Sequence, residues 1–180
     1  MPLTTLDPTV ALVLIDLQRG IAGQPGFAGT VANAAALAAA FRAHDLPVVL
    51  VNVTGQAPGR TDVTLPALDR PADWAELLPE LDQQPGDLRV AKQHWGAFIG
   101  TDLDARLRAR GVTQVVVGGV STSIGVESTA RSASELGYHV VLAVDAMADR
   151  DPAEHEHSVT RVFPRLGETT TTADLLARLG

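Results

Sequence analysis

The feature that most constrains the fold is a repeated alternation of short apolar runs with longer amphipathic segments. Residues 10–15 are all apolar, which is typical of a strand buried on both faces of a parallel sheet. Residues 30–44 have the apolar spacing of a helix, and residues 48–53 form the next apolar run. Strands that alternate with helices predict βαβ units, so we expect a three-layer α/β/α sandwich with a mostly parallel, Rossmann-like sheet.

The same alternation continues to the carboxyl terminus. The intervening residues 54–86, rich in Pro, Gly and Asp, predict a long loop with a helical turn near residues 72–78. Because 180 residues show no linker or repeat, we expect a single domain over residues 1–180. Further strands are predicted at 88–92, 113–119, 138–144 and 168–170, and further helices at 101–110 (capped by Thr101), 123–136, from Asp151-Pro152 onward, and 173–179.

Composition excludes several classes of protein. The net charge is −7 and no basic cluster occurs, so a nucleic-acid partner is not expected. The chain contains no cysteine, which excludes disulfides, thiolate zinc sites and a cysteine nucleophile. The amino terminus lacks the basic region of a targeting segment, and no apolar run is long enough to cross a bilayer. We therefore expect a soluble cytoplasmic protein with no membrane partner.

Polar residues follow the predicted strands at the edge where such sheets bind ligands. Asp16 and Gln18 follow the first strand, and Lys92, the only lysine, ends the third and precedes His94 and Trp95. Burial would raise the pKa of Asp16, whereas a nearby Lys92 would lower it. A proton donor needs the effect of burial on the pKa to exceed that of Lys92, and a general base needs the effect of Lys92 to be the larger. Both roles of Asp16 therefore stay open. The alternative is a structural ion pair that closes the sheet edge.

A second polar cluster follows the fourth strand. Gly119 permits a tight turn, and Ser121, Thr122 and Ser123 then precede a predicted helix. Backbone N–H groups at a helix start favour negative charge and can form an oxyanion hole. The alternative is an ordinary Ser/Thr N-cap. The strand 138–144 would deliver Asp145 to the same edge.

These motifs resemble those of the isochorismatase-like hydrolase superfamily, which has the cysteine hydrolase fold. The resemblance covers about residues 8–175 in the family's order. It implies that Asp16 is the catalytic acid or base, that Lys92 is the catalytic lysine, and that the Ser121–Thr122 peptide is a cis bond beside the oxyanion hole. The matching segments are Asp16-Leu-Gln18, Lys92 followed by His94-Trp-Gly-Ala-Phe98, and Gly119-Val-Ser-Thr-Ser-Ile-Gly-Val-Glu-Ser-Thr-Ala-Arg131.

Gly125 departs from the family pattern because it stands at the position of the nucleophilic cysteine. Most of the family are amidases that use this thiol, and that mechanism cannot operate here. True isochorismatases also lack the cysteine and cleave a vinyl ether, with the aspartate thought to supply the proton directly. Those enzymes, however, carry Tyr-Ala-His at the positions of Ser121–Ser123 and a glutamine at that of Val53. A glycine at the pocket floor can admit a ligand group or a water molecule.

The resemblance therefore implies a hydrolase without a thiol, acting on a small carboxylated metabolite through Asp16, assisted by Lys92, at a vinyl ether or a related C–O or C–N bond. A pocket-retaining binding module without catalytic activity is the alternative, and a third reading is that Gly125 replaces a cysteine of the native gene. The family tendency to pair subunits over the active-site rim predicts a homo-oligomer. Substrate contacts are expected from Gln18, His94, Trp95, Ser121, Thr122 and Ser123.

No metal or other cofactor is expected. Residues 52–54 lack the Asp-x-His ligands of the nicotinamidase branch. His155 and His157 are two residues apart, which places them on different faces of a helix, so we interpret both as surface residues. Ser121 and Ser123 have no evident histidine partner, which disfavours serine catalysis. Phe98 is assigned to the core, and Glu127 is expected to pair with Arg131 at i, i+4.

Overall fold

A six-stranded parallel sheet organises the protein, in a computed structural model that describes residues 3–62 and 70–180. The strand order is β3-β2-β1-β4-β5-β6, and every neighbouring pair is parallel. This confirms the predicted α/β sandwich, including the edge strand at residues 168–170. The strands are β1 (Val10–Ile15), β2 (Val48–Val53), β3 (Leu88–Lys92), β4 (Gln114–Val120), β5 (His139–Ala148) and β6 (Glu168–Thr170).

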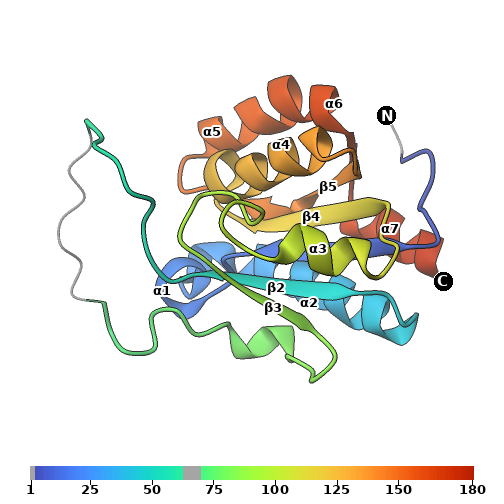
Figure 1. Ribbon diagram of the computed structural model, residues 1–180, viewed down its shortest axis with the longest axis horizontal. Coiled ribbons are helices and arrows are strands. Elements are labelled where there is room, and N and C mark those ends of the chain that lie inside the picture. Colours follow the sequence, from blue (N-terminus) through green and yellow to red (C-terminus); the bar gives the residue numbers. More distant parts are fainter. Residues whose placement is uncertain (1–2, 63–69) are drawn as a thin grey trace.

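The helices cover both faces of this sheet (Figure 1). Most of them match the predicted segments to within a few residues. The α-helices are α1 (Arg19–Ala22), α2 (Ala28–Ala43), α3 (Leu103–Arg108), α4 (Glu127–Glu135), α5 (Pro152–His157), α6 (Phe163–Leu166) and α7 (Thr172–Leu179). Two 3₁₀ turns, η1 (Pro25–Phe27) and η2 (Pro79–Leu81), and two π-helical turns, η3 (Thr122–Val126) and η4 (Ser158–Val162), complete the chain.

Alternate residues of each central strand enter two separate cores, which explains the uninterrupted apolar runs. Leu12 and Leu14 pack with α2 and α7, whereas Val13 and Ile15 pack with α3, α4 and α6. Phe98 is buried in the second core, as predicted. Each fully buried Leu or Ile contributes about 1.5–3 kcal/mol of transfer free energy, so this double burial fixes the strand register.

The end of β5 differs from the prediction. The register between β4 and β5 shifts between Val117 and Gly119, and pairing then resumes with Met147 and Ala148. The strand therefore runs past Val144, and Asp145 lies within it instead of at its end. Asp149 is the polar residue that follows the strand.

The turn after β4 also corrects two expectations. The cis peptide bond is Val120–Ser121, one residue before the predicted Ser121–Thr122 bond. The helix predicted from Ser123 begins with the π-helical turn η3, and its N-cap residue Ser121 makes no side-chain capping bond. Gly119 allows the close approach of β4 to β1 here, because it has a φ of 121° and a Cβ atom would lie 2.1 Å from the Ile15 carbonyl oxygen.

Smaller differences concern the helix ends and the long loop. Thr101 was predicted to cap α3, but Asp102 occupies the N-cap position, while the Thr101 hydroxyl accepts from the Leu103 amide at 3.3 Å. Residues 72–75 form the expected turn, and η2 was not predicted. Residues 63–69 of the predicted loop lie outside the described residues. In the described part of the chain, no helix is long and apolar enough to span a membrane.

Candidate active site

A buried ion pair joins the carboxyl ends of β1 and β3 across the end of β2. The Nζ of Lys92 donates to Oδ2 of Asp16 at 2.8 Å and to the backbone carbonyl of His94 at 3.2 Å. The Asp16 amide still donates to the Val51 carbonyl, and its φ of 52° then turns the chain away from the strand. The relative exposures of Asp16 and Lys92 are 5 % and 2 %. The sheet order therefore brings together the two residues predicted to be catalytic.

The Asp16 carboxyl is poised to change its protonation near neutral pH. Burial raises its pKa to about 6 from its usual 3.8, although the Lys92 ammonium opposes that rise. Its Oδ1 atom is buried and has no hydrogen-bond partner among the described residues. A carboxyl with one oxygen held by a cation and the other unpaired can donate or accept a proton at a bound ligand.

This raised pKa makes folding stability depend on pH. Because the folded state binds the proton of Asp16 more tightly than the unfolded state, the contribution favours folding at low pH. It is lost as the pH rises from 3.8 to about 6. A shift of that size corresponds to a loss on the order of 3 kcal/mol in the free energy of unfolding. Urea unfolding at a series of pH values should show this decrease in the wild type relative to Asp16→Asn. Parallel curves for the two proteins would contradict the assigned pKa.

Gly125 lies directly beside the ion pair. A Cβ atom at this position would lie 3.2 Å from Asp16 Oδ2, 2.9 Å from Ile15 Cγ2 and 3.5 Å from the Trp95 carbonyl oxygen. A side chain at this position would therefore require the Ile15 and Asp16 side chains to shift by a few tenths of an ångström. The glycine therefore keeps the Asp16 carboxyl accessible from the side of η3.

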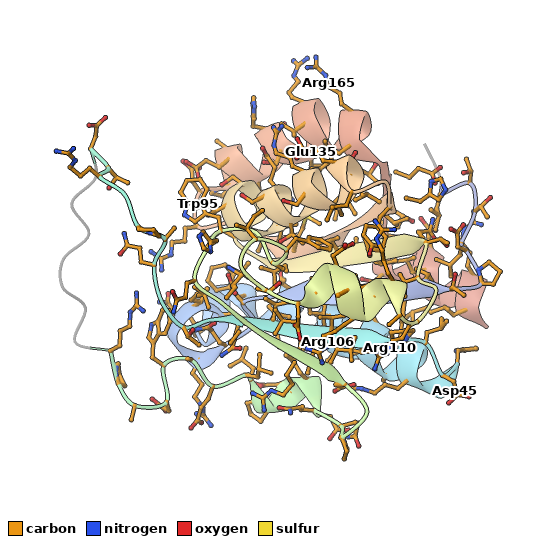
Figure 2. All side chains as sticks on the ribbon, viewed as in Figure 1. Asp45, Trp95, Arg106, Arg110, Glu135 and Arg165 are labelled. Atoms are coloured by element: carbon orange, nitrogen blue, oxygen red, sulfur yellow. The ribbon has the colours of Figure 1, made fainter. Side chains whose placement is uncertain are left out.

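A cavity of about 820 Å³ opens over these residues. Of the predicted ligand contacts, His94, Trp95 and Ser121 line it together with Asp16, Lys92 and Gly125. Trp95, labelled in Figure 2, has 64 % of its surface exposed at the rim. The loop after β2 contributes Arg60, and Arg70 lies 4.1 Å from the Trp74 ring centroid in a cation–π contact. Neither arginine is among the ligand contacts predicted from the sequence.

Gln18, Thr122 and Ser123 are not among the described residues that line this cavity. The amide of Gln18 is completely buried and bonds only backbone groups, accepting from the Val53 amide at 2.8 Å and donating to the Val53 and Trp74 carbonyls. It therefore fixes the end of β2 and the turn at Trp74. In this conformation a ligand would not reach it.

Two residues that the sequence analysis did not assign to the site contact the turn after β4. Asp149 Oδ2 accepts from the amide and the hydroxyl of Ser123, at 2.7 and 2.8 Å. The Nδ1 of His155 lies 2.8 Å from the Thr122 hydroxyl. The interpretation of His155 as a surface residue is therefore wrong, because α5 packs it half-buried against η3. His157 is exposed.

Two further features bear on the chemistry available. The predicted pair of Glu127 and Arg131 forms, at 2.9 Å. Among residues 3–62 and 70–180, no group of three or more His, Asp or Glu side chains has a geometry that could hold a metal ion. Thr122 has the histidine neighbour that Ser121 and Ser123 lack, but its side chain is fully buried and is not presented to the cavity.

Comparison with known proteins defines the class to which this fold and site belong. A family profile described as the Isochorismatase domain matches residues 10–174, and the chain belongs to this family of α/β hydrolases. It is 43 % identical over 176 residues to the uncharacterized isochorismatase family protein YwoC of Bacillus subtilis, covering 94 % of this chain and 93 % of the relative. It is 30 % identical to ureidoacrylate amidohydrolase RutB of Variovorax paradoxus, covering 97 % and 83 %.

Solved structures agree with this assignment. An isochorismatase family protein from Burkholderia thailandensis superposes with a TM-score of 0.92 and 44 % identity, covering 97 % of each chain. N-carbamoylsarcosine amidase from Thermoplasma acidophilum superposes with a TM-score of 0.74 and 29 % identity, covering 91 % of this chain and 96 % of the amidase. The resemblance inferred from the sequence motifs is therefore confirmed at the level of family and fold.

Proposed function

We propose that this hydrolase cleaves a small carboxylated enol ether by direct protonation from Asp16, without a covalent intermediate. The observation that carries the proposal is the carboxyl group of Asp16, whose pKa is raised to about 6 and which lies beside Gly125. Asp16 and Gly125 both line the cavity, so no side chain at position 125 stands between Asp16 and a reacting group bound in that cavity. The site therefore has a proton donor, Asp16, but no thiol nucleophile at position 125.

The proposed reaction proceeds in three balanced steps. Protonated Asp16 transfers its proton to the terminal carbon of the C=C bond, and the π electron pair forms the new C–H bond. This leaves an oxocarbenium ion and the Asp16 carboxylate, which the Lys92 ammonium stabilises. Water adds to the cationic carbon and returns a proton to Asp16. The hemiketal then breaks its C–O bond and gives a carbonyl compound and an alcohol.

Four cationic side chains, Lys92, Arg60, Arg70 and Arg150, line the cavity together with the carboxylates of Asp16, Asp149, Asp151 and Glu154. We assign the carboxylate of the substrate to the arginines Arg60 and Arg70, which are remote in sequence from the acidic segment 149–154. Arginine guanidinium groups bind carboxylates in a bidentate geometry. The stacking of Arg70 on Trp74 limits the conformations of this side chain, which lowers the entropy lost when it binds an anion. Trp74 and Trp95 provide apolar surface for the rest of the substrate.

Three backbone amides of the turn after β4 already have acceptors, which disfavours their use as an oxyanion hole in amide hydrolysis. An oxyanion hole needs free backbone N–H groups. The amide of Ser123 is bound by Asp149, and the amides of Ile124 and Val126 donate to the Ser121 carbonyl. Protonation of an enol ether forms a cation rather than an oxyanion, so this reaction does not need those amides.

A substrate panel tests the proposal. The purified protein should release pyruvate from isochorismate, an enolpyruvyl ether, and should leave ureidoacrylate and N-carbamoylsarcosine intact. Hydrolysis of either amide without turnover of the enol ether would contradict the proposed chemistry. Saturable binding of isochorismate with no pyruvate release would favour the binding-module alternative. The homo-oligomeric state stays a prediction from the family resemblance, and the cytoplasmic location stays a prediction from the sequence alone.

A further inference from the structure

The π-helical turn η3 is held from outside by the segment that joins β5 to α5. Asp149 follows β5 directly, and His155 lies on the side of α5 that packs against η3. Each bonds a different residue of the turn that carries Gly125. This turn therefore has side-chain partners on an element far from it in sequence.

Asp149 supplies the cap that the turn does not supply for itself. Since Ser121 at the N-cap makes no side-chain bond, the amide of Ser123 would otherwise be unpaired at the start of a helix. Asp149 Oδ2 accepts from both this amide and the Ser123 hydroxyl, and its Oδ1 accepts from the Arg150 amide at 2.8 Å. Bonds to a charged carboxylate are about twice as strong as neutral ones, so Asp149 holds Ser123 firmly.

His155 fixes the neighbouring residue, and Thr129 fixes the far end of the turn. The Thr122 hydroxyl is completely buried and has His155 Nδ1 at 2.8 Å. The Thr129 hydroxyl donates to the Gly125 carbonyl at 2.7 Å and accepts from the Ala97 amide at 3.1 Å. The turn is thus bonded on two sides.

The position of this turn matters because Gly125 has no side chain that could adjust. The space between Asp16 and the turn is set by the backbone of η3 alone, and a Cβ atom there would lie only 3.2 Å from Asp16 Oδ2. A displacement of about 1 Å at a reacting centre can lower a rate by about 100-fold. Bonds that hold the backbone of η3 therefore control the fit of the reacting group against Asp16.

We propose that Asp149 and His155 are positioning residues, which hold the turn Ser121–Gly125 at the separation from Asp16 that the reaction requires. The catalytic part of this inference rests on the proposed function. The mechanical part, that both side chains restrain the turn, does not depend on any substrate.

The chain offers a control for each residue. Asp149 itself lines the cavity, whereas Asp145 and His155 are not among the described residues that line it, so the His155 variant separates the positioning role from direct contact with the substrate. Asp145 lies within β5, the strand that Asp149 follows, and accepts from the amide and the hydroxyl of Thr172 at 2.7 and 2.9 Å, which is the same type of cap at the start of α7. His157 lies two residues from His155 on α5 and is exposed. Asp149→Ala should therefore be compared with Asp145→Ala, and His155→Ala with His157→Ala. Asp149→Asn keeps one oxygen that can accept from Ser123.

Hydrogen exchange of backbone amides and steady-state kinetics with isochorismate provide the two measurements. Amides of residues 121–126 should exchange at least about 10-fold faster in Asp149→Ala and His155→Ala, and at the wild-type rate in both controls. The value of kcat should fall by about 100-fold with KM nearly unchanged, and Asp149→Asn should recover part of the loss.

Each outcome bears on a separate part of the inference. Unchanged exchange in Asp149→Ala and His155→Ala would overturn the restraint of the turn. Faster exchange with unchanged kcat, or an equal loss of kcat in Asp145→Ala, would overturn the positioning role. Absence of turnover in the wild type would reject the proposed function and with it the catalytic part, while hydrogen exchange would still decide the mechanical part.

Discussion

Replacement of Asp16 by asparagine is expected to lower kcat/KM for the enol-ether substrate by about 1000-fold, because the amide cannot donate a proton to carbon. The variant keeps nearly the same volume and an oxygen that can accept from Lys92, whose Nζ lies 2.8 Å from Oδ2 in the wild type. Pyruvate release from isochorismate at a series of pH values is the measurement. The wild-type rate should fall as the pH rises through about 6, where Asp16 loses its proton.

Loss of folding must be separated from loss of chemistry in this variant, because a buried lysine without its partner is costly. Asp16→Asn combined with Lys92→Met removes both charges and should recover stability without recovering turnover. Thermal unfolding of the single and double variants provides the control. A folded Asp16→Asn protein with the wild-type rate would show that another group supplies the proton.

The sheet and its contents could be predicted because burial on both faces leaves a direct record in the sequence. Residues 10–15 and 48–53 are apolar at every or nearly every position, and both strands enter two cores. The meeting of Asp16 with Lys92 followed from the rule that parallel strands end at a common edge. The family motif identified Gly125 as the residue at the nucleophile position.

The polar residues that support the site could not be predicted, because no sequence pattern marks them in the way that apolar runs mark the buried strands. Asp149 was missed because the predicted strand ended at Val144, and a local shift of register between β4 and β5 extends pairing to Ala148. A shift of this kind depends on contacts with the neighbouring strand and has no sequence periodicity. Because β5 extends to Ala148, Asp149 lies at the ligand-binding edge of the sheet, where Asp145 was expected, and Asp145 lies within the strand.

His155 shows why helical geometry alone was insufficient. The i, i+2 spacing correctly separates His155 from His157 on different faces of α5. It does not identify the face that packs against another element, because α5 has no buried apolar residue to mark its inner side. The cis peptide bond was predicted one residue too late, at Ser121–Thr122 instead of Val120–Ser121. Neither peptide precedes a proline, so the sequence motif does not show which of the two is cis.

Addition of one methyl group at Gly125 is expected to reduce turnover of the enol ether by about 100-fold or more. In Gly125→Ala the new Cβ atom would lie 3.2 Å from Asp16 Oδ2 and 2.9 Å from Ile15 Cγ2, in the space that we assign to the reacting group of the substrate. The methyl group occupies the side from which we expect the reacting group to approach Asp16, and a misplacement of that group by about 1 Å is enough for this loss. The measurement is kcat and KM for isochorismate, with thermal unfolding of the same samples.

Gly29→Ala is the matched control, because Gly29 lies in α2 and a Cβ atom there would meet nothing within 4 Å. It should keep full activity and gain about 0.5–1 kcal/mol of stability from the helix preference of alanine. Gly125→Cys fills the same space and should lose enol-ether hydrolysis as Gly125→Ala does, whatever amide hydrolysis the thiol introduces. Retention of enol-ether turnover in both Gly125 variants would place the reacting group elsewhere in the cavity and remove the central support for direct protonation by Asp16.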